Sequence, residues 1–140
     1  MRLEKQFDVN QSADCASRIA IRDETLLSLF PGSTTEIVES GAGRRTTRTH
    51  YTALGRSGVA TFRFTFLPEG SISFEKVCDG NVWQELSGKV SFRKREDGAR
   101  VTLQMDGRTK TFVPEFAIRG PMQDQIEQMA AALRTCIEAG

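Results

Sequence analysis

The feature of this sequence that most constrains its fold is an amphipathic pattern over residues 121–139. Apolar residues recur there at spacings of three and four, which places them on one face of a helix. These positions are Met122, Ile126, Met129, Ala130, Leu133, Cys136 and Ile137. Pro121 suits the start of a helix, because proline has a helical φ and no N–H is needed there. At about 1.5 Å per residue, this helix is long enough to cross a small domain.

The beginning of the chain predicts one strand and two short helices. Residues 2–9 alternate, with Leu3, Phe7 and Val9 on the apolar face. Residues 10–14 then offer side chains that cap helices, and apolar residues follow at helical spacing up to position 21 or 22. A second short helix is expected over residues 24–30, because the Pro-Gly pair at 31–32 stops it.

Residues 34–112 contain regularly spaced turn signals, as expected of an antiparallel meander. Turn signals fall at 40–43, 55–58, 68–70, 79–81, 96–98 and 106–107. The segments between them alternate between apolar and polar residues, as expected of a sheet with one buried face. We therefore expect about six strands here and about seven in total. The pair at 106–107 is compatible with either a hairpin turn or a bulge.

Composition restricts the class of protein. The length of 140 residues fits one domain spanning positions 1–140. Nineteen basic and eighteen acidic side chains give a formal charge of +1, which argues against nucleic-acid binding by phosphate neutralisation. No apolar run approaches the roughly 20 residues that span a bilayer, so no integral membrane association is expected. The first residues lack the apolar core of a signal peptide, and we expect a cytoplasmic protein.

Motifs for metal, phosphate or nucleophilic chemistry are missing from the sequence. His50 is the single histidine, and the cysteines at 15, 78 and 136 are too dispersed for a zinc motif. We interpret these cysteines as free thiols of a reduced compartment, and we expect neither a metal nor a cofactor. The glycine-rich stretch at 41–45 lacks the pattern of a phosphate loop and is interpreted as a hairpin turn. No GxSxG motif accompanies the histidine.

The order of strand, two short helices, meander and long helix resembles the START-like superfamily, also called the SRPBCC or helix-grip fold. The local segments that carry the resemblance are SADCASRIAIRD, LLSLFPG, DGARVTLQMDG and VPEFAIRGPMQDQIEQMAAALRTCIE. The superfamily includes polyketide cyclase-like proteins, coenzyme Q-binding-like proteins and relatives of a small component of carbon monoxide dehydrogenase. The resemblance implies an α+β fold in which a curved antiparallel sheet of about seven strands wraps around the C-terminal helix. It also implies a deep, mostly apolar cavity for a hydrophobic small molecule or lipid.

Aromatic residues and methionines on the apolar strand faces either fill a core against the last helix or line such a cavity. Both alternatives use the same face. The candidate cavity-lining residues are His50, Tyr51, Phe62, Phe64, Phe66, Phe74, Phe92, Leu103, Met105, Phe112, Met129 and Leu133. The alternation around position 50 is weak, so the sequence does not decide whether His50 or Tyr51 faces inward. Trp83 falls on the polar face of its segment.

Three functions are compatible with these patterns. The preferred one is a non-enzymatic binding protein, monomeric or homodimeric, that holds an apolar ligand between the sheet and the last helix. The second is a cyclase or aromatase-like enzyme, which requires His50 or Tyr51 to point into the cavity as a protonatable group. The third is a protein-interaction module without a ligand, which predicts a filled interior and an exposed apolar patch around Trp83. Cationic residues at 44, 45, 48 and 56 are interpreted either as a binding surface or as protection of a sheet edge.

Overall fold

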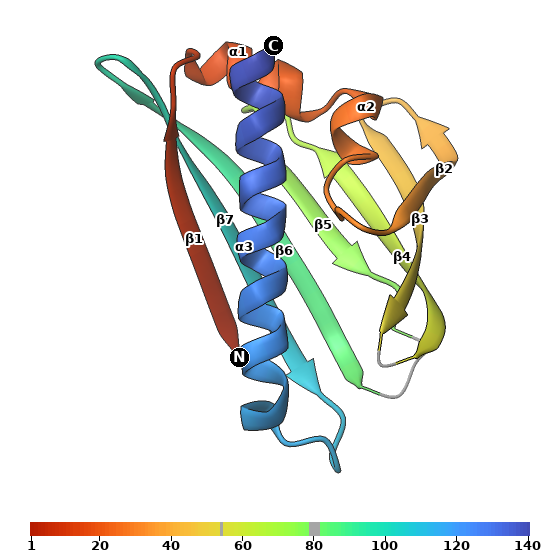
Figure 1. The fold of residues 1–140 in the computed structure, drawn as a ribbon. Helices are drawn as coiled ribbons and strands as arrows, with labels where there is room; N and C mark the ends of the chain where they lie inside the picture. The colour runs from red at the N-terminus through yellow and green to blue at the C-terminus, as the bar shows by residue number, and fades with distance from the viewer. Residues whose placement is uncertain (54, 79–81) are drawn as a thin grey trace.

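Seven β-strands and three helices make up the regular structure of the described residues, 1–53, 55–78 and 82–140, in the computed structural model of the chain (Figure 1). The strands are β1 (Arg2–Val9), β2 (Thr34–Gly41), β3 (Arg44–Ala53), β4 (Arg56–Phe66), β5 (Ile72–Lys76), β6 (Trp83–Arg95) and β7 (Gly98–Thr109). The helices are α1 (Ala13–Ala20), α2 (Asp23–Leu26) and α3 (Glu115–Ala139). All strands join one antiparallel sheet in the order β1-β7-β6-β5-β4-β3-β2. The first strand therefore pairs with the last, and the others follow as a meander.

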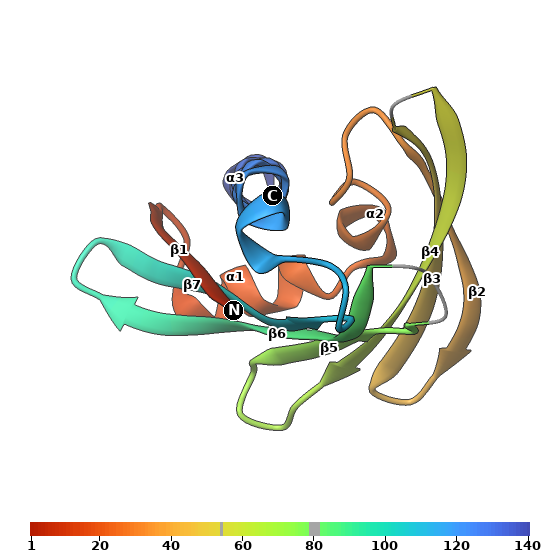
Figure 2. The same ribbon diagram turned by 90° about the horizontal axis from the view of Figure 1, so that it is seen from below.

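The sheet is strongly curved, and the helices occupy its concave side. Figure 2 shows β2, β3 and β4 turned up from the plane of β1, β7 and β6. Helix α3 packs on β1 and β7, and α2 lies between α3 and the strands that curl up (Figure 2). This arrangement confirms the predicted α+β helix-grip fold. No helix within the described part of the chain combines the length and apolarity needed to cross a membrane.

The core forms where the apolar side chains at every second position of the strands meet the apolar side chains spaced three and four residues apart on α3. From β7, the buried side chains are Ala99, Val101, Leu103 and Met105. From α3, they are Met122, Ile126, Met129, Ala130, Leu133 and Ile137, and Cys136 at the edge of this stripe is partly exposed. The apolar stripe predicted for the last helix is thus confirmed, and it is the face that contacts the sheet.

The beginning of α3 differs from the prediction. The helix begins at Glu115, with Pro114 in extended conformation before it, and Pro121 lies inside. A proline at this position removes one backbone donor and crowds the preceding turn. The structure accommodates it near the end of the helix, where residues 115–117 and 119–121 are exposed. Helix α2 is also shorter than expected, since it ends at Leu26.

Several of the predicted turns are confirmed, and others are displaced. Gly43, at φ 71°, closes the turn between β2 and β3, as the glycine-rich stretch predicted. The turn between β3 and β4 comes earlier than predicted, because β4 already begins at Arg56. The pair at 106–107 lies within β7 in regular register with Ser87 and Leu86, so it is neither a hairpin turn nor a bulge. The turn predicted at 79–81 falls outside the described residues.

Trp83 is buried, and its prediction as a polar-face residue was wrong. The register between β6 and β7 shifts between Trp83 and Glu85, and this irregularity reverses the alternation at the start of β6. The indole then packs over Gly107, where a Cβ atom would lie 2.4 Å from the ring. A glycine on β7 therefore makes room for the tryptophan. An exposed patch around Trp83, which the interaction-module hypothesis requires, is not formed.

Candidate functional site

The space between the sheet and α3, where the resemblance placed a deep cavity, is nearly filled. A small void of about 20 Å³ remains there, close to the smallest volume that holds one water molecule. Its lining is entirely apolar and comes from both layers: Ala20, Leu26, Leu29, Phe64, Ile72, Phe74, Val90, Leu103, Met129 and Leu133. The expectation of a deep cavity is corrected accordingly. Five of the predicted cavity residues nevertheless meet at this void.

Aromatic rings fill most of the interior beside the void. Phe30, which follows α2, stacks on Phe62 of β4 with ring centroids 5.2 Å apart. Phe64 and Phe74 are in contact across β4 and β5, with centroids 5.8 Å apart. Phe62 links the two pairs, at 6.4 Å from Phe74. The phenylalanine-rich face predicted from β4 is therefore a packed aromatic cluster.

A stripe of hydroxyl groups runs beside this cluster along the concave face of β3. Thr47 and Thr49 are both buried, two residues apart on the same face. The Thr49 hydroxyl lies 2.9 Å from that of Thr35 on β2, so these two are hydrogen-bonded. Thr47 Oγ1 has no hydrogen-bond partner among the described residues, although it is fully buried. A buried polar group without a partner is unfavourable, and its position opposite Phe62 puts it next to the aromatic cluster.

The α2 segment, residues 23–30, covers this part of the concave face. The buried apolar side chains of the segment are Leu26, Leu29 and Phe30. The segment is held by few polar contacts: the Thr25 hydroxyl donates to the carbonyl of Ile19 at 2.7 Å, and Arg45 pairs with Asp23 at 3.0 Å. Helix α2 has four residues and no side-chain cap at its N-terminus. Short uncapped helices depend on tertiary packing, so the position of this segment rests on the packing of its buried side chains.

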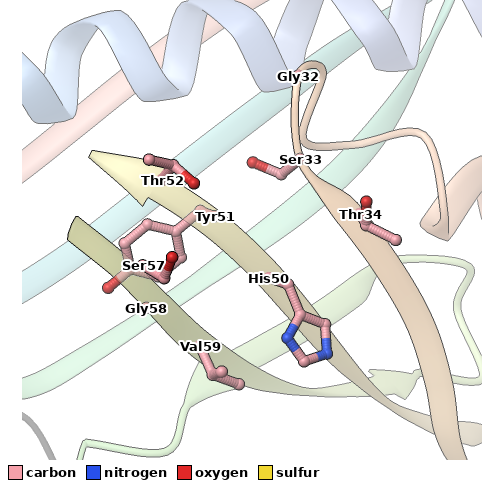
Figure 3. A pocket seen from close by; sticks show the side chains of 9 residues that line it. All are labelled: Gly32, Ser33, Thr34, His50, Tyr51, Thr52, Ser57, Gly58 and Val59. Carbon is pink, nitrogen blue, oxygen red and sulfur yellow. The ribbon is translucent and has the colours of Figure 1, made fainter. Parts of the chain in front are cut away.

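A second, open pocket of about 440 Å³ lies across the ends of β2, β3 and β4 (Figure 3). Its lining is mixed polar and apolar: Gly32, Ser33, Thr34, His50, Tyr51, Thr52, Ser57, Gly58 and Val59. Strand alternation places Thr34, His50, Thr52, Ser57 and Val59 on the outer face of the sheet, with Tyr51 and Gly58 on the inner face. The pocket is therefore a hollow around the strand ends and is separate from the small void.

The structure decides which of the two neighbouring candidates faces inward. Tyr51 lies on the concave face, where its ring covers Gly58 of β4, and it is 39% exposed. His50 points to the outer face, with Nε2 at 3.2 Å from a carboxylate oxygen of Glu36. The histidine is thus not directed at the interior, where the enzyme hypothesis needs a protonatable group.

The remaining predicted residues are scattered. Met105 is buried in the sheet core, and Phe66 and Phe92 are partly buried at its margins. The guanidinium of Arg45 stacks over Phe66, 5.8 Å from the ring centroid. Phe112 is 97% exposed in the segment between β7 and α3. It does not line the interior, because β7 ends at Thr109 and Phe112 lies in the turn that follows, between Lys110 and Val113.

Sequence reasoning missed seven residues that border the candidate site: Leu26, Leu29, Phe30, Ala20, Thr47, Ile72 and Val90. The first three follow no clear period, because α2 ends after one turn. Thr47 and Thr49 do have strand spacing, which was the available signal. Threonine, however, is compatible with either face of a strand.

Ionisable groups contribute little to the interior. No cluster of three or more potential metal ligands occurs among the residues that the structure describes. The resolved pKa shifts belong to exposed groups on the outside. Arg100, aided by Arg95, holds the pKa of Asp8 below its ordinary value, and Ser71 lowers the pKa of Glu69. A hydrogen bond to Asp106 raises the pKa of Arg2. The candidate site is therefore apolar apart from its hydroxyl groups.

Comparisons with known proteins identify the fold. No protein-family model matches the sequence, and no curated protein matches it significantly. Among solved structures, the Zhui aromatase/cyclase from Streptomyces sp. R1128 has a TM-score of 0.77 and 17% identity, covering 99% of this chain and 92% of that one. A START superfamily protein from Mycobacterium smegmatis has a TM-score of 0.77 and 20% identity, covering 99% and 97%. A STAR-related lipid transfer protein from Xanthomonas axonopodis has a TM-score of 0.69 and 14% identity, covering 97% and 85%.

Proposed function

Because the chain has the START/SRPBCC fold, we propose that it binds a hydrophobic small molecule or lipid between its sheet and α3, without transforming it. The observation that carries the proposal is the buried Thr47 hydroxyl, which has no partner among the described residues and lies opposite Phe62, beside the aromatic cluster of the interior. An apolar ligand with one hydrogen-bonding group would satisfy this hydroxyl. Burial of the rest of the ligand would supply the binding free energy.

The ligand site is closed in the absence of ligand. Pockets for drug-sized molecules have volumes of roughly 300–1,000 Å³, far above the void of about 20 Å³. Outward movement of the α2 segment would withdraw Leu26, Leu29 and Phe30 and enlarge the void toward Thr47. The apparent affinity is then lowered in proportion to the small fraction of open molecules.

Binding without catalysis is favoured by the position of the histidine. The single histidine of the chain lies on the outer face, beside Glu36. A general base must come within hydrogen-bond distance of the proton that it removes. A ligand between the sheet and α3 would be on the opposite side of β3 from His50. Of the two groups that the enzyme hypothesis named, Tyr51 alone lies on the concave face, where it is 39% exposed, so cyclase-like or aromatase-like chemistry would have to rest on this phenol without the histidine.

Native mass spectrometry of the protein purified from its own cells tests the proposal. We expect an adduct of a few hundred daltons that is lost on denaturation. Titration with an apolar fluorescent dye, 1-anilinonaphthalene-8-sulfonate, provides a second test on protein without the adduct. The absence of an adduct together with the absence of saturable dye binding would contradict the proposal.

Paired threonine variants test the site. Thr47→Val is expected to weaken binding of the purified adduct several-fold, because one hydrogen bond contributes about 0.5–1.5 kcal/mol. Thr49→Val is the matched control, since the Thr49 hydroxyl is already bonded to Thr35 and should not contact the ligand. Equal losses in both variants would argue against Thr47 as the polar anchor.

A further inference from the structure

We propose that the segment between β7 and the first turn of α3, residues 110–119, docks the protein on the surface of an anionic lipid membrane. Two phenylalanines on this segment, Phe112 and Phe116, are 97% and 84% exposed. The other large apolar side chains that are exposed reach 51% at most among the described residues. Phenylalanine is usually buried, and two such side chains four residues apart are an unusual surface feature. We name them the phenylalanine pair.

Hydrogen bonds hold the segment in a defined shape. The backbone N–H of Lys110 donates to the carbonyl of Val82 at 2.9 Å, which ties the segment to the residue that precedes β6. The N–H of Val113 donates to the carbonyl of Lys110 at 2.9 Å and closes a turn with Phe112 inside it. The Thr109 hydroxyl donates to the carbonyl of Val113 at 2.7 Å. The exposure of Phe112 is thus set by an ordered turn.

The phenylalanine pair protrudes from one end of the molecule. Figure 1 shows the segment beyond the ends of β6 and β7, with the first turn of α3 beside it. The end of β3, which carries Tyr51, lies at the same end (Figure 1). A protruding pair without a surrounding groove suits insertion into a soft, apolar layer. The acyl boundary of a bilayer accepts such side chains without requiring a complementary shape.

The charges around the pair favour an anionic surface. Three carboxylates at this end are already paired: Asp106 with Arg2 at 2.7 Å, Glu85 with Arg108 at 3.2 Å, and Glu115 with the N-terminal ammonium of Met1 at 3.5 Å. Lys110 and Arg119, at the two ends of the segment, have no ion-pair partner among the described residues. Two cations without an ion-pair partner in the described part of the chain therefore flank the phenylalanine pair. Cations near an anionic membrane strengthen binding by about fivefold each, or about 1 kcal/mol.

This docking mode does not depend on the ligand proposed above, because none of its residues lines the small void. Docking would add a location to that function. A protein held at a bilayer surface is close to the apolar molecules that are dissolved in the bilayer. The two proposals fail separately. Vesicle binding tests the segment, and solution binding of the adduct or dye tests the interior.

Co-sedimentation with vesicles is the main test. The full chain is mixed with vesicles of phosphatidylcholine alone and with vesicles that also contain phosphatidylglycerol. We expect binding to the anionic vesicles that weakens with added salt, and weaker binding to the neutral ones. Phe112→Ser with Phe116→Ser should reduce binding roughly hundredfold, at about tenfold for each side chain. Lys110→Gln with Arg119→Gln should reduce binding to anionic vesicles only.

The matched control is Val38→Ser with Val59→Ser. These apolar side chains are also exposed, at 39% and 51%, and lie outside both this segment and the α2 segment. The control should bind vesicles as the wild type does. Absence of vesicle binding by the wild type, or equal binding by the phenylalanine and control variants, would overturn the proposal. Self-association in solution that disappears in the phenylalanine variant, without vesicle binding, would identify a second copy of the chain as the occupant and would also overturn it.

A fluorescence test follows insertion directly. In Phe112→Trp, the new indole should shift its emission to shorter wavelength when anionic vesicles are added. Trp83 is buried, so its own emission should stay constant in the wild type. Unchanged emission from the variant in the presence of bound vesicles would show that Phe112 does not enter the bilayer.

Discussion

The two ends of the curved sheet are built differently. At one end, β1, β7 and β6 lie beneath α3, and side chains such as Val101 and Ile126 are fully buried. At the other end, β2, β3 and β4 curl away and are covered in part by the α2 segment, with an open pocket at the strand ends (Figure 2). The buried polar residues of the second region include Thr47 and Thr49.

The two regions of the sheet therefore contribute differently to stability and to binding. The region under α3 supplies stability, because its apolar faces are complementary and closed. The curled region keeps features that reduce stability: a hydroxyl without a described partner and a short covering helix. Such features are commonly retained where a protein binds or moves. The two regions should therefore respond differently to equivalent changes.

The largest difference is expected from loss of side-chain volume. Ile126→Ala in α3 removes a fully buried side chain and should lower the free energy of unfolding by about 2–5 kcal/mol. Val59→Ala in β4 removes a side chain that is 51% exposed. This substitution should change the free energy of unfolding by less than about 0.5 kcal/mol. Urea denaturation followed by circular dichroism measures both. Similar losses in the two variants would remove the basis of the comparison.

Added volume gives the second contrast, at two glycines that each lie beneath an aromatic ring. A Cβ atom at Gly88 would meet the Phe74 ring at 2.2 Å and the backbone carbonyl oxygen of Gln104 at 2.6 Å. At Gly58 it would meet the Tyr51 ring alone, at 2.4 Å. Phe74 is enclosed, whereas Tyr51 is free to rotate toward solvent.

Gly88→Ala should therefore lower the unfolding free energy by about 1–3 kcal/mol, and Gly58→Ala by clearly less. Thermal unfolding of the two variants side by side provides the measurement. A loss in Gly58→Ala as large as that in Gly88→Ala would mean that Tyr51 is as firmly packed as Phe74.

A smaller effect of opposite sign is expected at the hydroxyl stripe. Thr47→Val removes a buried hydroxyl without a described partner and should raise the free energy of unfolding by about 1 kcal/mol. Thr49→Val breaks the hydrogen bond to Thr35 and should lower it by a similar amount. Chemical denaturation in the absence of ligand distinguishes the signs. Destabilisation by both substitutions would show that the Thr47 hydroxyl is satisfied in solution.

The smallest effect concerns charge on the outside of the α3-covered region. Asp8 lies 3.0 Å from Arg100 and 3.1 Å from Arg95, and its pKa is held below the ordinary value. The folded state therefore binds this proton less readily than the unfolded chain. The stabilisation is fully present above the unfolded pKa of about 3.9 and is lost as the pH falls through the folded pKa.

Asp8→Asn should accordingly be slightly less stable than the wild type at neutral pH and equal to it in strong acid. Denaturation curves over this pH range provide the measurement. A stability difference that does not depend on pH would assign the effect of Asp8 to packing.

Local periodicity accounts for what the sequence predicted correctly. The stripe of α3 and the alternation of β4 and β7 each arise within one element, so the sequence alone identified their buried faces. Trp83 was placed on the wrong face because the register shift beside it depends on pairing with β7. Phe112 was placed inside because an apolar residue after the strand pattern has no period to orient it.

The volume of the interior was also beyond sequence reasoning. The same phenylalanines serve a filled core or a cavity wall, and the outcome depends on how Phe30 stacks on Phe62. This contact joins the end of α2 to β4 and is a matter of tertiary packing. The importance of Thr47 could likewise be recognised only once its surroundings were known.

The central claim is that ligand enters beneath the α2 segment and lies against β3 and β4. Amide hydrogen exchange, measured with and without saturating 1-anilinonaphthalene-8-sulfonate, tests it most directly. We expect altered exchange in residues 23–32, along β3 and β4, and around the residues of β7 and α3 that line the void, Leu103, Met129 and Leu133, with the amides of β1 unchanged. Changes confined to β1, or no change under saturating dye, would contradict this claim.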